Sequence, residues 1–169
     1  MWTLYFTYGI ITILLIHAML FGINKIIASK KKYSMLKSQA NNYHLFFQVF
    51  AIWLNNLHNK KNIAEYLLEQ GHKNVAVYGG DTICGLVCSE LENTAIEVKY
   101  LIDQNAYKSK EVTGYKGLDI VCVDEIQQQE KVDAIIVTSI NEYNLINKKI
   151  RQVAPDIPTI SLDQIVFSL

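Results

Sequence analysis

The sequence predicts an α/β protein in three parts: a transmembrane helix over residues 1–24, a helical linker over 25–72, and a domain over 73–169 with a five-stranded parallel sheet. Three observations predict this organisation. The first residues form a long uncharged run, the next carry an apolar stripe at helical spacing, and the last alternate between short apolar strands and helices. Such alternation is typical of a parallel sheet covered by helices on both faces.

The N-terminal run, from Trp2 to Asn24, contains no charged side chain. As a helix rising 1.5 Å per residue it would be about 34 Å long, enough to cross a hydrocarbon core of about 30 Å. A secretory signal peptide would carry basic residues before its apolar core, and none precede this one. A helix buried in a globular core is the other alternative, and the length of the run favours the span.

Charge is distributed unevenly, although the net charge of the chain is zero. Seven lysines and no acidic residue precede Glu65, whereas nine basic and sixteen acidic residues lie from Glu65 onward. The lysines after the apolar run predict, by the positive-inside bias, a single-pass protein of the cell membrane with a cytoplasmic C-terminal domain. They also favour contact with anionic lipid headgroups. The acidic remainder argues against a nucleic-acid partner, because phosphate binding depends on lysine and arginine.

Three cysteines, Cys84, Cys88 and Cys122, lie in the predicted cytoplasmic part. An odd number in a reducing compartment argues against a disulfide framework. The first two are four residues apart, which is not the spacing of redox or zinc motifs. We therefore expect small buried side chains here, and no metal site.

The linker carries an apolar stripe within residues 34–58, whose members recur at spacings of three and four. A solvated helix would not expose this much aromatic area, so the stripe must be covered. The membrane interface, the following domain and the same helix of a second chain are the three alternatives. For the last, a homo-oligomer, the candidate residues are Tyr43, Phe46, Phe47, Phe50, Trp53 and Leu57.

A short helix is expected over residues 62–70, because Asn62 can cap it, Glu65 completes a capping box, and Gly71 can end it in a left-handed conformation. After it, β-rich runs alternate with helical ones. Strands are expected over residues 74–78, 96–102, 119–123, 132–138 and 159–160, and helices over 82–93, 124–129 and 143–153. This order predicts a small Rossmann-like domain.

The first turn of that domain offers a candidate nucleotide site. In Rossmann folds a glycine-rich turn lets phosphate reach the N-terminus of the next helix, and an acid about twenty residues later binds the ribose. The candidate cofactor-binding residues here are Gly79, Gly80, Thr82 and Asp103. Only the first glycine of the G-x-G-x-x-G pattern is kept, since Asp81 and Cys84 stand at the other two positions. The sequence thus predicts a degenerate site for NAD(P) or a sugar nucleotide, or a turn that binds no cofactor.

From Trp53 onward, about two thirds of the chain resembles bacterial Rossmann-like proteins associated with capsule and other surface-polysaccharide synthesis. Those proteins are similar to the N-terminal domain of sugar O-acetyltransferases and to epimerase-like proteins. The residues that carry the resemblance are Tyr78-Gly79, Ile96 to Asp103, Asn105-Ala106, Val132 to Thr138 and Ile160 to Ile165. The resemblance implies the fold and a role in polysaccharide biosynthesis, and because this fold hosts many functions it implies no particular reaction.

Three functions remain open at this point. The first is a membrane-anchored module that binds a nucleotide or sugar nucleotide, or that recruits glycan-synthesis enzymes. The second is a nucleotide-sugar epimerase or dehydratase, which would need a fuller sheet and a substrate domain with a tyrosine–lysine pair. The third is a purely structural oligomer. The sequence offers no catalytic residues for the second, because its remaining histidines, His44, His58 and His72, all precede the nucleotide turn.

Overall fold

The computed structural model describes the backbone of residues 2–104 and 117–169, and the side chains of His17 and of residues 19–104 and 117–169. By its internal contacts the chain divides into two compact units, Met1–Leu45 and Phe46–Leu169. Among the described residues, no helix is both long and apolar enough to cross a membrane. The predicted span falls mainly on side chains outside that description (residues 1–16 and 18), as does the Asn105-Ala106 part of the resemblance.

Helix α1 (Trp2–His58) contains both the first unit and the beginning of the second. The sequence predicts an N-terminal helix and a separate connecting helix, but the structure has one. The physical reason is that the residues between them include no proline and several lysines, which favour a helix.

The sheet of the second unit has five parallel strands, as predicted. They are β1 (Asn74–Tyr78), β2 (Glu97–Ile102), β3 (Ile120–Val121), β4 (Ala134–Val137) and β5 (Thr159–Ser161). Their order, β3-β2-β1-β4-β5, is that of the first five strands of a Rossmann fold. This order places the point where the chain reverses its direction of winding between β1 and β4.

The helices described in the domain, outside residues 105–116, are short. They are α2 (Ile63–Glu69), α3 (Thr82–Leu91), α5 (Tyr143–Val153) and α6 (Leu162–Ser168), with 3-10 turns η1 (Val123–Gln128) and η2 (Ile140–Glu142). Two predicted signals for α2 are confirmed: the Asn62 side chain accepts a hydrogen bond from the Glu65 amide at 3.0 Å, and Gly71 adopts a φ of +80°.

The third strand is shorter than predicted, because the Glu125 carboxylate accepts the Cys122 amide proton at 2.9 Å and starts a 3-10 turn there. Helix α6 is not among the predicted elements. It has seven residues, just under two helical turns, so its buried residues repeat too few times to reveal a period.

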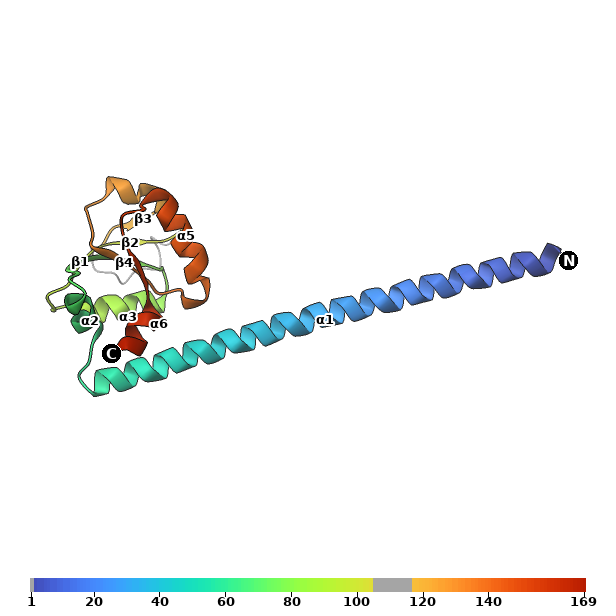
Figure 1. The fold of residues 1–169 in the computed structure, drawn as a ribbon, viewed down its shortest axis with the longest axis horizontal. Helices are drawn as coiled ribbons and strands as arrows, with labels where there is room; N and C mark the ends of the chain where they lie inside the picture. Colours follow the sequence, from blue (N-terminus) through green and yellow to red (C-terminus); the bar gives the residue numbers. More distant parts are fainter. Residues whose placement is uncertain (1, 105–116) are drawn as a thin grey trace. The chain divides into compact units, whose positions relative to one another are not determined.

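Helices cover both faces of the sheet (Figure 1). On one face, Tyr78, Tyr100 and Val137 pack with Ile146 and Ile150 of α5. The neighbouring strand residues point to the opposite face, where α3 contacts β1 and β2, α6 contacts β5, and α2 packs against both helices. The parallel sheet is therefore buried on both sides.

The C-terminal end of α1 docks on the domain within the second unit. Trp53 is only 4% exposed, and its indole N–H donates to the Glu90 Oε2 atom at 2.5 Å. The other Glu90 oxygen accepts the Ile63 amide proton at 2.6 Å, and Asn56 donates to the Val166 carbonyl at 2.8 Å. One carboxylate thus ties α1, α2 and α3 together. Of the three alternatives for the apolar stripe, docking on the domain is confirmed for Trp53.

Candidate functional site

The turn after β1 requires glycine at position 79. Gly79 has a φ of +146°, and a Cβ atom there would lie 2.2 Å from Thr138 Oγ1. Thr138 follows β4 and is buried, and both its hydroxyl and its amide donate to the Tyr78 carbonyl, at 3.0 and 3.1 Å. These bonds join the ends of β1 and β4 at the point where Rossmann folds hold their ligands. The sequence analysis placed Thr138 in the fourth strand but did not recognise it as a site residue.

Asp81, next in the turn, is the N-cap of α3. Its Oδ1 atom accepts the amide protons of Ile83 and Cys84, each at 3.1 Å. These are the donors that a bound phosphate would use at a helix N-terminus. The chain therefore supplies an anion of its own where a dinucleotide would place its pyrophosphate.

The structure brings the four predicted site residues to one edge of the sheet. Gly79, Gly80 and Thr82 belong to the turn and the start of α3. The Gly79 amide donates to the Ile102 carbonyl at 2.9 Å, which places the turn beside Asp103, the residue that follows β2. Asp103 therefore lies beside the turn, and the Asp81 carboxylate occupies two of the amides at the start of α3.

Cys84, at the last glycine position of the pattern, does not push α3 away from the sheet. Its side chain is fully buried, and its Cβ atom lies 3.5 Å from the Cβ position built at Gly79, an ordinary van der Waals contact. The expectation of a buried Cys84 is confirmed, whereas Cys88 and Cys122 are half-buried. A hydrogen bond with Cys84 lowers the pKa of the Cys88 thiol, and burial opposes that shift.

The electrostatics of this edge are acidic. Burial is the main cause that raises the pKa of the Tyr78 phenol, and the carboxylates of Asp103 and Glu142 raise it further, against a hydrogen bond from Gln104 that lowers it. The carboxylates of Asp103 and Glu142 therefore lie near Tyr78, at the carboxyl end of β1, and add negative charge there.

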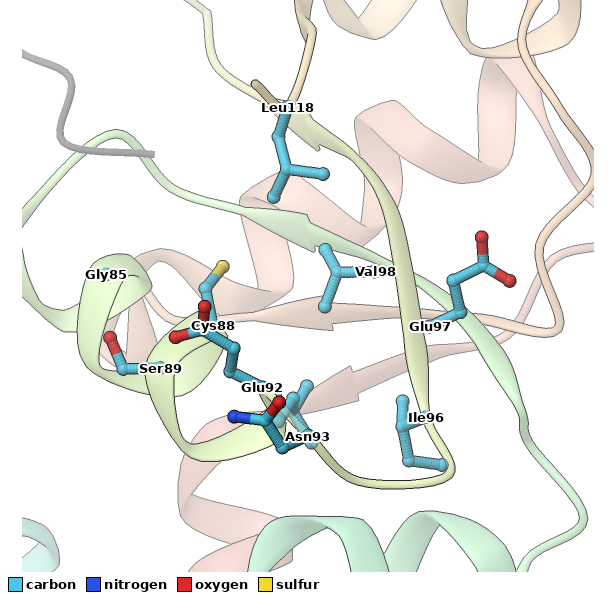
Figure 2. A pocket seen from close by; sticks show the side chains of 10 residues that line it. Gly85, Cys88, Ser89, Glu92, Asn93, Ile96, Glu97, Val98 and Leu118 are labelled. Atoms are coloured by element: carbon cyan, nitrogen blue, oxygen red, sulfur yellow. The ribbon is translucent and has the colours of Figure 1, made fainter. Parts of the chain in front are cut away.

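Two hollows lie away from that edge. One, of about 320 Å³, lies between α3 and the first residues of β2. Figure 2 shows side chains that line it, among them Cys88, Glu92, Val98 and Leu118. The second is an apolar groove of about 300 Å³ between the end of α1 and α3. Neither includes the predicted cofactor-binding residues.

Among the residues that the structure describes, no cluster of three histidine, cysteine or acidic side chains is arranged to hold a metal ion. No protein-family model, curated protein or solved structure matches the chain.

Proposed function

We propose that the chain is a membrane-tethered Rossmann-like module that serves surface-polysaccharide biosynthesis by holding other components in place, and not by catalysis. The observation that carries this proposal is the hydrogen bonding of Asp81 to the N-terminus of α3. A pyrophosphate-binding enzyme keeps those amides free for its cofactor, and this chain uses them to hold its own helix.

The repulsion between the Asp81 carboxylate and a bound phosphate is large enough to support the non-catalytic proposal. Two unit charges about 4 Å apart repel by roughly 4 kcal/mol at an effective dielectric constant near 20. That energy corresponds to a loss of about 10³ in affinity. To avoid it, a phosphate would have to displace the Asp81 carboxylate, and losing a helix cap costs about 0.5–2 kcal/mol.

The tether rests on the sequence. Residues 2–24 are uncharged and lysines follow them, which supports a single span and a cytoplasmic domain. The polysaccharide context rests on the resemblance given above. Protease digestion of sealed inside-out vesicles tests the orientation, and we expect cleavage of the domain without detergent; protection of the domain contradicts it.

Calorimetry on the full-length chain in detergent micelles tests the non-catalytic proposal. We expect no binding of NAD⁺, NADP⁺ or a uridine diphosphate sugar to the wild type at concentrations up to about 1 mM. Asp81→Gly should gain measurable binding, because it frees the amides of Ile83 and Cys84 and removes a charge. Asp81→Asn is the matched control, since asparagine keeps the cap and removes only the charge.

Tight binding by the wild type, or turnover of a sugar nucleotide by the purified chain, would contradict the proposal. To test the scaffolding role itself, site-specific photo-cross-linking in cells should trap enzymes of surface-polysaccharide synthesis on the domain. Trapping none of them would count against that role.

A second candidate function follows from the position of Asp103. Its place beside the Gly79 turn favours binding of a nucleoside whose phosphates point away from α3. If calorimetry detects such a ligand, Asp103→Asn should weaken its binding at least tenfold and Asp81→Asn should leave it nearly unchanged. Equal effects of the two substitutions would contradict this candidate.

A further inference from the structure

Helix α1 carries a seven-residue repeat whose side chains are exposed, apart from Phe50, which is half-buried and packs edge-on against Trp53. In the first unit the repeat places Ile26, Ser29, Tyr33, Leu36, Ala40 and Tyr43 at alternating spacings of three and four. In the second unit Phe47, Phe50, Leu54 and Leu57 continue the same spacing. These ten positions, here called the seam, correspond to the a and d positions of four and a half heptads, and nine of them are apolar, aromatic or alanine.

The seam is distinct from the surface of α1 that docks on the domain. Val49, Trp53 and Asn56 are buried in the second unit, whereas Phe47 is 71% exposed and Leu54 and Leu57 are exposed as well. In the first unit, Tyr33, Leu36 and Tyr43 are also exposed. Within the second unit the domain therefore covers one face of α1 and leaves Phe47, Leu54 and Leu57 exposed beside it.

The period of the seam identifies the kind of partner. An α-helix has 3.6 residues per turn, so a stripe with a period of 3.5 turns by about 20° per heptad around a straight helix. Over the seam the drift reaches roughly 90°, which a flat lipid surface cannot follow. A second helix that supercoils with the first can follow it.

We propose that the seam pairs with the seam of a second copy of this chain in a parallel, two-stranded coiled coil. A second copy supplies the same spacing over the same length, and two-fold symmetry makes the interface self-complementary. The parallel orientation rests on the proposed tether, which holds both N-termini in one membrane. Phe50, Leu54, Leu57 and Leu86 line the apolar groove between α1 and α3. In the proposed dimer, the partner's helix fills this groove.

The apolar area is sufficient for a stable dimer. The exposed aromatic residues Tyr33, Tyr43 and Phe47 can each bury about 150–250 Å², or roughly 450–750 Å² in all. Ile26, Leu36, Leu54 and Leu57 add to this area. A standard interface buries about 800 Å² per partner, which the seam therefore reaches.

The basic residues beside the seam make pairing depend on anions. Lys25 and Lys32 stand at g positions, and Lys30 and Lys37 at e positions, so in a parallel pair each lysine faces a lysine of the partner. Salt or anionic lipid headgroups screen this repulsion. Dimerisation should thus strengthen as ionic strength rises, by at least threefold between 0.05 and 0.5 M sodium chloride.

Cysteine cross-linking of the full-length chain in nanodiscs tests the register and the orientation. Ser29 lies at a d position, so Ser29→Cys should form a disulfide-linked dimer under mild oxidation, because paired d positions bring Cα atoms within disulfide range. Ser38→Cys, at an f position on the opposite side, is the matched control and should not. Equal cross-linking of the two variants, or none of Ser29→Cys, overturns the parallel pairing.

Mass measurement by analytical ultracentrifugation in detergent tests the seam itself. Phe47→Glu should weaken the dimer at least a hundredfold, whereas Gln48→Glu, the same charge at a neighbouring exposed position, should change it less than threefold. Circular dichroism checks that both variants keep the fold. A monomeric wild type at 100 µM, or equal loss in both variants, contradicts the proposal. The seam shares no residue with the Asp81 turn, so this failure and a failure of the proposed function can be told apart.

Discussion

Because Gly79 has no side chain, Thr138 at the end of β4 can approach the end of β1. The Thr138 hydroxyl occupies the space that a Cβ atom would need, and it bonds to the Tyr78 carbonyl. In Rossmann folds the first glycine of the pattern is explained by the tight turn that leads into the phosphate-binding helix. Here the approach of a buried threonine explains it equally well, so the glycine alone does not indicate a ligand.

The crowding at Gly79 predicts a large loss of stability on Gly79→Ala, about 2–4 kcal/mol, because the new methyl group meets a buried side chain and the positive φ disfavours alanine. Urea unfolding followed by circular dichroism measures it. Gly71→Ala is the matched control, since Gly71 also has a positive φ but has nothing within 4 Å of its Cβ position, and it should cost about 1 kcal/mol. Losses of equal size would show that contact with Thr138 contributes nothing.

At the scale of elements, Glu90 connects three helices through its partly buried carboxylate. Its two oxygens accept separate protons from Trp53 and Ile63, an arrangement that suits a carboxylate. Burial nevertheless is the main cause that raises the pKa of Glu90, and the two hydrogen bonds only oppose it. A raised pKa in the folded state means that the contribution of Glu90 to stability is complete below about pH 4.3, the usual pKa of glutamate, and is lost as the pH rises through the folded-state pKa.

Glu90→Gln should therefore affect stability in a pH-dependent way. The amide nitrogen would face a donor, so the variant should be about 1–2 kcal/mol less stable at pH 4. The difference in the free energy of unfolding between the variant and the wild type should become smaller toward pH 7, because only the wild type is destabilised by burying a charged carboxylate. Urea unfolding at both pH values, followed by tryptophan fluorescence, measures this difference. A difference that widens as the pH rises contradicts this account of Glu90.

The elements also show what the sequence could reveal. Short apolar strands and the cap at Asn62 carry local signals, so the parallel sheet and α2 could be predicted. The docking of Trp53 could not be predicted, because its partner Glu90 lies thirty-seven residues away and has the sequence pattern of an ordinary surface residue of α3. For the site, the turn and Asp103 could be predicted from spacing. The sequence shows that Asp81 replaces a glycine of the pattern. It does not show the hydrogen bonds from the Ile83 and Cys84 amides to the Asp81 side chain, because these depend on the backbone geometry of the turn.

At the scale of the whole molecule, the same chain combines two kinds of apolar surface. Within the second unit, the domain buries Val49 and Trp53 on one face of α1. The seam residues Phe47, Leu54 and Leu57 stay exposed. The domain adds an acidic sheet edge whose phosphate-binding amides are occupied. These features are the basis of our proposal that the chain holds partners near a membrane and does not turn over a nucleotide.

The Asp81 carboxylate occupies the amides at the start of α3 that a phosphate would use. The most direct measurement is the NMR shift of the Ile83 and Cys84 amides while inorganic pyrophosphate is added to the full-length chain in micelles. We predict that both resonances stay in place in the wild type up to about 10 mM and move in Asp81→Gly, because only the variant leaves these donors free. Saturable movement of both resonances in the wild type would contradict the account.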